Sequence, residues 1–174
     1  MARKKQQAST PATLALQAAG VSFMVHSYEH SSQAESYGGE AAALLGVSAS
    51  RVFKTLMVAT GPTAATGLAV AVVPVDGSLD LKAAGMALGS KKLVMADSQA
   101  AQRRTGYVLG GISPFGQRQS SPAVFDSSAL EFDTIFISGG RRGLSLELDP
   151  ADAARVAGAS WASIAARRPE SPAS

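Results

Sequence analysis

The sequence predicts one α/β domain of the α+β type, in which a mixed β-sheet is combined with helices. Apolar stretches of strand length are interspersed with helix-length stretches that begin at capping residues. Several neighbouring strands are joined by glycine-rich turns, which favours hairpins and a mixed sheet over a doubly wound parallel one. The length of 174 residues suits a single domain with a substantial core.

Helix starts and ends are indicated by caps. Thr10 with Pro11 begins the first helix, because a threonine cap and a proline in the first turn favour a helix start. Asp149 with Pro150 repeats this pattern near the end of the chain. The helices are expected from 11 to Gly20, over 39–45, from Asp80 to before Gly89, from Asp97 to 105, and from Asp149 onward.

Short stretches rich in β-branched and other apolar residues are typical of strands. They cover residues 21–28, 51–59, 68–75, 93–95, 107–109, 124–125, 134–138 and 144–148. A Gly/Pro/Thr turn joins the second stretch to the third, which predicts a hairpin, and the Gly-Gly-Arg-Arg-Gly turn joins the last two.

Residues 11–166 are expected to form the domain, with flexible tails at 1–10, which is basic, and at 167–174. No internal linker or repeat is recognised. No signal peptide opens the chain, and the longest apolar run, residues 68–75, is too short to cross a bilayer. We therefore expect a soluble cytoplasmic protein with no membrane partner.

The absence of cysteine excludes disulfides, thiolate metal sites and a cysteine nucleophile. The net charge of +3 permits contact with a phosphate-bearing partner without requiring one. Basic pairs recur along the chain, and most of them are interpreted as solvated surface charge.

Two stretches of the sequence resemble catalytic motifs, but neither is interpreted as a catalytic site. The residues His26-Ser27-Tyr28-Glu29-His30 match the zinc-protease string H-x-x-E-H, which requires both histidines on one helical face. This string follows an alternating strand, so a strand end leading into a polar loop is favoured and no metal is expected. The segment around Ser113 lacks the second glycine of G-x-S-x-G, because Phe115 stands there. No phosphate-binding loop of the Walker or G-x-G-x-x-G type follows a strand.

Lys54 interrupts an apolar strand face. Side chains alternate along a strand, so Lys54 shares one face with three aliphatic residues, Val52, Leu56 and Val58. An unpaired ammonium is costly to bury. Two interpretations stay open: the side chain extends along an edge strand to water, or this face lines a pocket with an anionic or strongly polar occupant.

Two glycine strings add to the second interpretation. Residues 106–116, GYVLGGISPFG, and Ser138-Gly139-Gly140 each follow an expected strand. Consecutive glycines let a backbone approach a ligand and turn its N–H groups toward an anion, although plain turns use the same residues. With Lys54 they would make a site for a small polarised group.

Six segments together resemble the YbaK/EbsC family of aminoacyl-tRNA deacylases, and most closely its Cys-tRNA(Pro) deacylases, which are similar to prolyl-tRNA synthetase editing domains. The likeness keeps order and spacing from about residue 12 to residue 166. The segments are HSYEH at 26–30, VFKTLMVA at 52–59, LDLK at 79–82, RTGY at 104–107, GGISPFGQ at 110–117 and FISGGRRGL at 136–144.

The resemblance implies a mixed, barrel-like sheet flanked by helices, and hydrolysis of the ester between a mischarged amino acid and the tRNA 3′ end. It implies no metal and no cofactor. Lys54 takes the position of the family's essential lysine and would hold the terminal phosphate or ribose, while the Gly110 and Gly111 amides receive the developing oxyanion. The substrate-binding residues are expected to be Tyr28, Tyr37, Thr55, Ser113 and Ser138.

The resemblance also implies how the reaction proceeds and with which partners. In the Cys-specific members the substrate's own thiol attacks the ester, so the enzyme positions rather than supplies a nucleophile. The expected partner is the mischarged tRNA 3′ end, with prolyl-tRNA synthetase as a further candidate. Ser145 stands where close relatives carry aspartate, so a deacylase for alanine or another small amino acid stays open. A non-catalytic RNA-binding or synthetase-associated module is a third interpretation.

Overall fold

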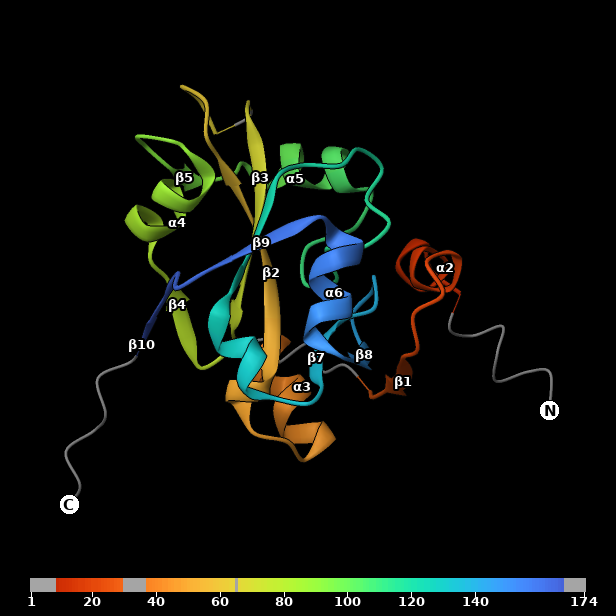
Figure 1. The fold of residues 1–174 in the computed structure, drawn as a ribbon. Helices are drawn as coiled ribbons and strands as arrows, with labels where there is room; N and C mark the ends of the chain where they lie inside the picture. Colours follow the sequence, from red (N-terminus) through yellow and green to blue (C-terminus); the bar gives the residue numbers. More distant parts are fainter. Residues whose placement is uncertain (1–8, 30–36, 65, 168–174) are drawn as a thin grey trace, which may run out of the picture.

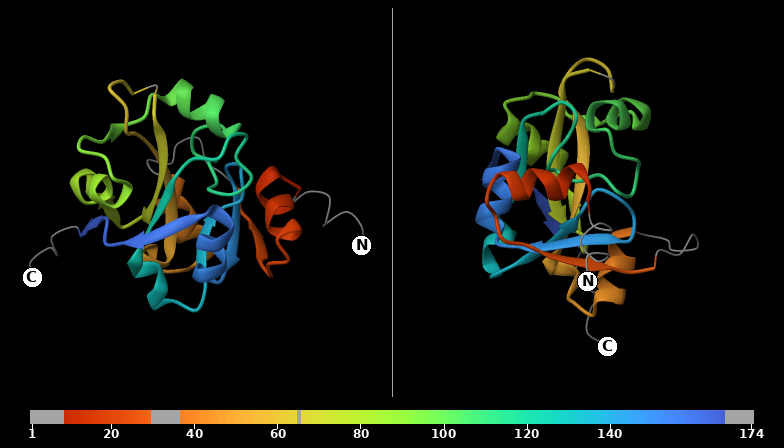
Figure 2. Two further views of the ribbon diagram at one scale, coloured as in Figure 1. Left: turned by 45° about the horizontal axis from the view of Figure 1, so that its top comes forward. Right: turned by 90° about the vertical axis from the view of Figure 1, so that its right-hand side faces the viewer.

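The computed structural model describes residues 9–29, 37–64 and 66–167. Helices cover both sides of a twisted, mixed β-sheet (Figures 1 and 2). The predicted single α+β domain with a mixed sheet flanked by helices is confirmed. The tails expected at 1–10 and 167–174 lie mostly outside the described residues, although Thr10 and Arg167 both take part in the fold.

The main sheet has eight strands in the order β1-β8-β7-β2-β3-β6-β9, with β5 paired to β2 beside this path. The β7–β2, β3–β6 and β6–β9 pairs are parallel and the others antiparallel, which makes the sheet mixed. Its strands are β1 (Met24–Ser27), β2 (Val52–Ala59), β3 (Leu68–Pro74), β5 (Val94–Met95), β6 (Ala123–Asp126), β7 (Ile135–Ser138), β8 (Leu144–Leu148) and β9 (Ala159–Ala162). A separate two-stranded sheet pairs β4 (Gly77–Leu79) with β10 (Ala165–Arg167).

The helices with predicted N-terminal caps begin where expected, whereas the first helix ends at Ala18 rather than Gly20 and the second begins at Tyr37 rather than Gly39. The carboxylates of Asp80, Asp97 and Asp149 accept backbone N–H groups of the first turn, and Thr10 forms a reciprocal capping box with Thr13. The helices are α2 (Pro11–Ala18), α3 (Tyr37–Leu45), α4 (Leu81–Leu88), α5 (Ser98–Thr105) and α6 (Pro150–Ala157), with short 3₁₀ helices η1 (Ala49–Arg51) and η2 (Ser127–Glu131).

Two layers of helices bury the two faces of the sheet. On one face the buried residues of α2, α5 and α6 pack with Phe53 and Met57 of β2. On the other face, Val52 packs with α3 and Val58 packs with α4, in two separate clusters. The alternation predicted for β2 is therefore confirmed, and Lys54 lies on the face that carries α3 and α4.

Residues 107–109 form a loop, so the strand predicted there was wrong. Tyr107 is buried, and its hydroxyl donates to the carbonyl of Phe115 at 2.5 Å, which ties the two ends of the loop together. Residues 107–109 resemble a strand in the sequence because this buried tyrosine anchors the loop. The strands β4, β9 and β10 were not predicted, because they are short and rich in alanine, serine and glycine.

His26 lies on β1, so the first histidine of the H-x-x-E-H string is on a strand rather than a helix; His30 lies outside the described residues. The Nε2 atom of His26 is 2.9 Å from Oε1 of Glu147 on β8. The other carboxylate oxygen accepts from the Thr134 hydroxyl at 2.6 Å and from Arg51 at 3.2 Å. His26 is thus part of a structural polar cluster on the sheet surface.

This cluster predicts a pH-dependent contribution to stability. The hydrogen bond from Thr134, followed by interactions with His26 and Arg51, lowers the pKa of Glu147 below its ordinary value of 4.5. A carboxylate with a depressed folded-state pKa stabilises the fold above the unfolded-state pKa, and this contribution is lost as the pH falls through the folded-state pKa. We expect Glu147→Gln to lower the free energy of unfolding by about 1–3 kcal/mol near pH 7, and less in acid.

Denaturant unfolding across this pH range measures the effect. Asp152→Asn is the matched control, because Asp152 pairs with Arg155 on the exposed surface at 3.2 Å and should contribute about 0–1 kcal/mol. A Glu147→Gln loss that is equal at neutral and acid pH would show that packing, not charge, is responsible.

In the described parts of the chain, every helix is too short or too polar to span a membrane.

Candidate active site

A cavity lies at a gap in the sheet beside β2. On one side β2 pairs with β3 along its length, but on the other it pairs with β7 only at Val52 and Phe53 and with β5 only at Val58 and Ala59. Residues 54–57 therefore have no neighbouring strand on that side within the described chain. A cavity of about 400 Å³ occupies this position.

The open edge exposes the main chain of Thr55 to the cavity. The carbonyl of Val52 points to the β3 side, where it accepts from Val75 at 2.8 Å, and that of Met57 points to the gap side, where it accepts from Ala96 at 3.0 Å. Backbone N–H and C=O groups alternate in direction along a strand. The N–H and C=O of Thr55 therefore face the gap and are available to a ligand.

Five of the predicted site residues line this cavity, together with Ser145. They come from the end of β1, from β2, from the glycine loop after α5 and from the β7–β8 hairpin. The five are Tyr28, Lys54, Thr55, Gly110 and Ser138. The fold thus assembles most of the expected site from segments more than 100 residues apart.

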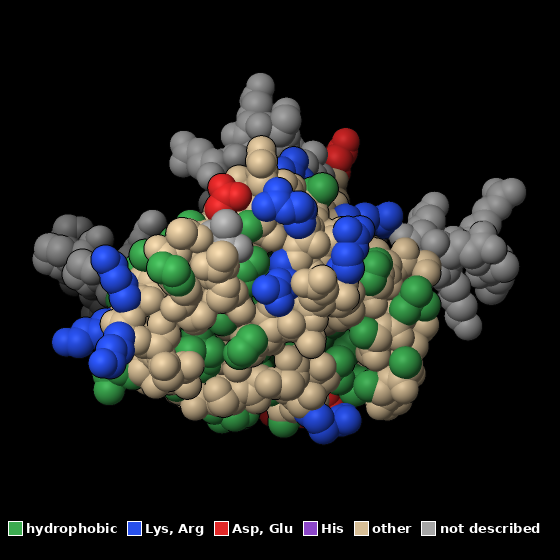
Figure 3. Space-filling view, turned by 90° about the horizontal axis from the view of Figure 1, so that it is seen from above, with side chains coloured by type: hydrophobic (Ala, Val, Ile, Leu, Met, Phe, Trp, Pro, Cys, Tyr) green, Lys and Arg blue, Asp and Glu red, His purple; other side chains and the backbone are tan. Residues whose placement is uncertain are grey.

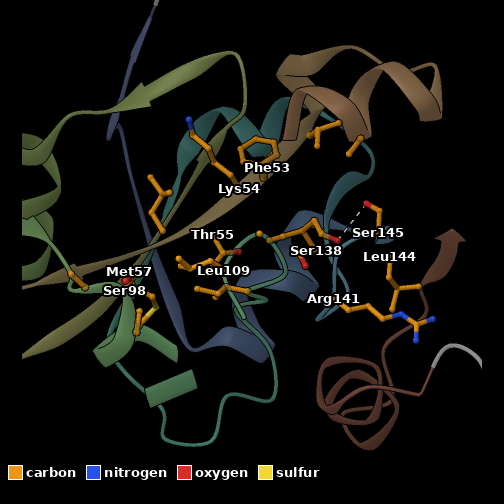
Figure 4. A pocket seen from close by; sticks show the side chains of 18 of the residues that line it. Phe53, Lys54, Thr55, Met57, Ser98, Leu109, Ser138, Arg141, Leu144 and Ser145 are labelled. Carbon is orange, nitrogen blue, oxygen red and sulfur yellow. Dashed lines mark hydrogen bonds between the residues drawn. The ribbon is translucent and has the colours of Figure 1, made fainter. Parts of the chain in front are cut away.

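Lys54 and Thr55 leave β2 on opposite faces of the sheet (Figure 4). Lys54 is half-buried between the α3 and α4 clusters, and its ammonium lies at one side of the cavity. Besides Lys54, the only charged side chain lining the cavity within the described chain is Arg141. The charged side chains among the described lining residues are therefore both cationic, which favours an anionic or electron-rich occupant beside them, while the carboxylate of Glu40 acts on Tyr28.

The hydroxyl of Thr55 is buried without a hydrogen-bond partner among the described residues. A buried hydroxyl without a hydrogen-bond partner costs free energy of folding. In native structures such groups are often explained by a role in function or by a bound water or ion. Thr55 was predicted to bind the substrate only because of the family resemblance. No local pattern of residues marks it, because its isolation depends on the gap between β5 and β7.

Ser138 and Ser145 lie opposite each other across the β7–β8 hairpin and both line the cavity. The Ser138 hydroxyl accepts from the N–H of Gly140 at 3.2 Å, and the Ser145 hydroxyl donates to the carbonyl of Ile137 at 3.5 Å. Ser145 is polar and supplies no negative charge where an aspartate would, so the charged lining residue of this hairpin is Arg141.

The two glycines of the loop have different roles. Gly110 lines the cavity with a φ of 83°, a left-handed conformation that favours glycine, and no hydrogen bond to its N–H is found within the described chain. The N–H of Gly111 donates to Val108 at 3.0 Å, so it is not available to an oxyanion. A Cβ at Gly111 would lie 2.7 Å from Cα of Arg141, which shows that this glycine permits close packing of two loops.

Two further predicted residues are not placed in the cavity. Ser113 is fully buried outside the lining, and its hydroxyl accepts from the N–H of Phe115 at 3.3 Å within the loop. Tyr37 begins α3, but its side chain lies outside what the structure describes.

Tyr28 contributes a phenol at the edge of the cavity. Burial raises the pKa of Tyr28, with Glu40 adding to the increase and a hydrogen bond with Gly143 opposing it. The phenol therefore stays protonated near neutral pH and can donate a hydrogen bond to a substrate oxygen.

Apart from Ser98 at the start of α5, the remaining described lining is apolar. Met95 and Leu109, 47% and 41% exposed, lie on it together with buried residues such as Ile137. No carboxylate, imidazole or thiol lines the cavity in the described chain. The described lining residues can therefore hold and polarise a small group, but among them is neither an activated nucleophile nor a carboxylate or imidazole that could act as general base.

Comparison with known proteins identifies the family. The aminoacyl-tRNA editing domain matches residues 32–156, which is most of the chain. The chain belongs to the aminoacyl-tRNA editing domain family. Within it, the chain is a member of the YbaK/EbsC group, so it is an aminoacyl-tRNA deacylase, a hydrolase of translation that acts on tRNA.

Relatives agree with this placement. EbsC of Enterococcus faecalis, named as a candidate Cys-tRNA(Pro)/Cys-tRNA(Cys) deacylase, is 34% identical over 86% of this chain and 89% of its own length. The fold matches a crystal structure described as a candidate trans-editing enzyme for prolyl-tRNA synthetase, with a TM-score of 0.78, 23% identity and coverage of 91% of this chain and 98% of that one. A protein described only as hypothetical matches with the same TM-score of 0.78, at 27% identity over 90% of this chain and 100% of that one.

Proposed function

We propose that this deacylase removes cysteine from mischarged tRNA(Pro), and that the thiol of the substrate is the nucleophile. The absence of a carboxylate, imidazole or thiol from the described cavity lining carries this proposal. An ester can be cleared in such a site if the attacking group arrives with the substrate. The name of the E. faecalis relative supports cysteine as the amino acid.

In this reaction the cysteine sulfur attacks the carbonyl carbon of its own ester and a C–S bond forms. The tetrahedral intermediate collapses, the C–O bond to the ribose breaks, and the thiol proton passes to the ribose oxygen. Cysteine leaves as a cyclic thiolactone, which water opens later. The enzyme accelerates the step by holding the side chain folded against the ester, since orientation alone contributes several kcal/mol.

Each cavity residue has a role in this proposal. The ammonium of Lys54 binds the terminal phosphate or ribose, and the N–H of Gly110 faces the developing oxyanion. Donors placed for charge that develops in the transition state are often the largest catalytic contribution. Thr55 and Ser138 orient the ester and the amino group, and the Tyr28 phenol donates to a substrate oxygen.

A deacylase for alanine is the second candidate, because Ser145 supplies no carboxylate to the cavity wall where close relatives carry aspartate. Alanine has no nucleophile, so water would have to attack, and the same donors would then position that water. Prolyl-tRNA synthetase as a delivery partner, and a cytoplasmic location where tRNAs are charged, complete the proposal.

A panel of charged tRNAs tests the function. The purified protein is incubated with tRNA(Pro) carrying cysteine, serine or alanine, and loss of the ester is followed. We expect Cys-tRNA(Pro) to be cleared fastest, because a thiol is a better nucleophile than a hydroxyl and is partly ionised near pH 7. The first product should be the thiolactone. Equal rates for Ala-tRNA(Pro) and Cys-tRNA(Pro) would instead favour attack by water.

A further inference from the structure

We propose that a lysine-lined groove at the C-terminal end of α4 binds the phosphate backbone of the nucleotides that precede the terminal adenosine of the tRNA. This inference rests on the proposed function, because the cavity beside it must hold the terminal aminoacyl group. It adds the direction in which the RNA strand leaves the site. We call this surface the α4 groove, and it consists of Leu81, Lys82, Gly85, Met86 and residues 89–93.

The α4 groove is a basic hollow of about 510 Å³. Lys82, Lys91 and Lys92 line it, all three are exposed, and no carboxylate is among its described lining residues. In Figure 3, Lys and Arg side chains gather at the left edge of this face, where α4 lies. Phosphates are bound by such clusters through direct attraction and the release of counterions.

The two carboxylates that flank this segment in the sequence each cap a helix. Asp80 accepts from Ala83 at 3.0 Å at the start of α4, and Asp97 accepts from Ala100 at 3.0 Å at the start of α5. Both carboxylates are thus directed at helix N-termini.

The loop that carries two of the lysines is held firmly against α4. The N–H of Ser90 donates to Gly85 at 2.8 Å, and the Ser90 hydroxyl donates to the carbonyl of Lys92 at 3.0 Å. A Cβ at Gly85 would lie 2.9 Å from the carbonyl oxygen of Ser90, so only glycine permits this approach. The backbone at Lys91 and Lys92 is therefore held in place by packing, which lowers the backbone entropy that would be lost when a ligand binds.

The α4 groove and the cavity share one short segment. Leu93, directly before β5, lines the groove, and Met95 at the end of β5 lines the cavity. This strand lies beside α4 (Figure 1). At a rise of about 3.3 Å per strand residue, the two Cα atoms are roughly 7 Å apart. This is about the reach of one nucleotide of an extended strand, so a chain whose last residue occupies the cavity enters the groove within one or two nucleotides.

The apolar part of the α4 groove suits single-stranded RNA rather than an isolated phosphate. Met86 is 77% exposed and Leu81 and Leu93 add apolar wall. Sites for single-stranded nucleic acid combine basic residues for the backbone with side chains that contact the base faces, most often aromatic ones. Among the described residues of the α4 groove, Met86 and the leucines take this place. Methionine is flexible enough to fit different bases, so this contact should not select a sequence.

The alternative exit passes over α5, where Arg103 and Arg104 occupy the last turn. The test compares two charge-matched variants, Lys91→Gln/Lys92→Gln and Arg103→Gln/Arg104→Gln, with Arg155→Gln on α6 as a distant control. Each is assayed for tRNA binding across a salt series and for deacylation of Cys-tRNA(Pro). Each is also assayed with the cysteine ester of adenosine, which has no preceding nucleotides.

We expect Lys91→Gln/Lys92→Gln to reduce the slope of log K against log salt by about 1.4, which corresponds to two lost single-strand phosphate contacts. KM for the tRNA should rise several-fold with kcat unchanged, and the adenosine ester should react as with the unmodified protein. A slope that falls only in the α5 variant would overturn the proposal, as would equal losses on the tRNA and the adenosine ester. If the unmodified protein clears neither substrate, the proposed function fails instead.

Discussion

Replacement of Lys54 by alanine should lower kcat for the cognate aminoacyl-tRNA by about 10²–10³-fold, the loss typical of one electrostatic donor in an active site. The folded state should persist, because the half-buried side chain lies on a cavity wall and its truncation removes an ammonium from an apolar face. Single-turnover deacylation, together with thermal unfolding of the same sample, measures both expectations.

Lys54→Arg should fail as well, since a planar guanidinium is larger and directs its hydrogen bonds differently from an ammonium. Arg155→Ala is the control for loss of a positive charge, because this side chain is exposed on α6. A folded Lys54→Ala protein that deacylates at the unmodified rate would identify Lys54 as a surface lysine whose apolar neighbours are incidental.

Thr55→Val should separate activity from stability. Valine keeps the shape of threonine and removes a buried hydroxyl that has no partner in the described chain, so the free energy of unfolding should stay constant or rise by about 1 kcal/mol. If this hydroxyl binds the substrate, kcat/KM should fall by about 10–100-fold, as expected for a lost hydrogen bond of about 1.5–3 kcal/mol.

Thr134→Val is the matched control for this substitution. The Thr134 hydroxyl donates to Glu147 at 2.6 Å in the surface cluster, so its loss should reduce stability and leave kcat/KM unchanged. The role assigned to Thr55 would be rejected if Thr55→Val destabilised the protein while its activity stayed intact, because the hydroxyl would then have a structural partner.

Local sequence rules accounted for much of the fold. The caps at Thr10, Asp80, Asp97 and Asp149 begin helices, and the alternation along β2 assigns Lys54 to the face opposite Phe53. These features depend on a residue and its near neighbours. The tyrosine at 107 misled the prediction, because an anchoring aromatic in a loop resembles a strand residue until its partner at Phe115 is known.

The predictions for the site also divide into those that the structure places at the cavity and those that depend on contacts invisible in the sequence. The lysine on an apolar strand, the glycine strings and the family likeness together named five residues that line one cavity. They also named Gly111, whose N–H is already used by Val108, and Ser113, which is buried in its own loop. Residue type alone cannot show whether a polar group faces a cavity or a neighbouring backbone.

The sequence by itself therefore determined most helix starts, the main hairpin and the family, and it indicated Lys54 as a candidate site residue. Only the tertiary structure decided that β2 has no neighbouring strand between β5 and β7 within the described chain, that the Thr55 hydroxyl has no partner among the described residues, and that Leu93 lines the α4 groove while Met95 lines the cavity. The physical reason is the distance along the chain over which each effect acts. Caps and alternation act over a few residues, whereas a gap in a sheet exists only once strands distant in the chain have paired on both sides of it.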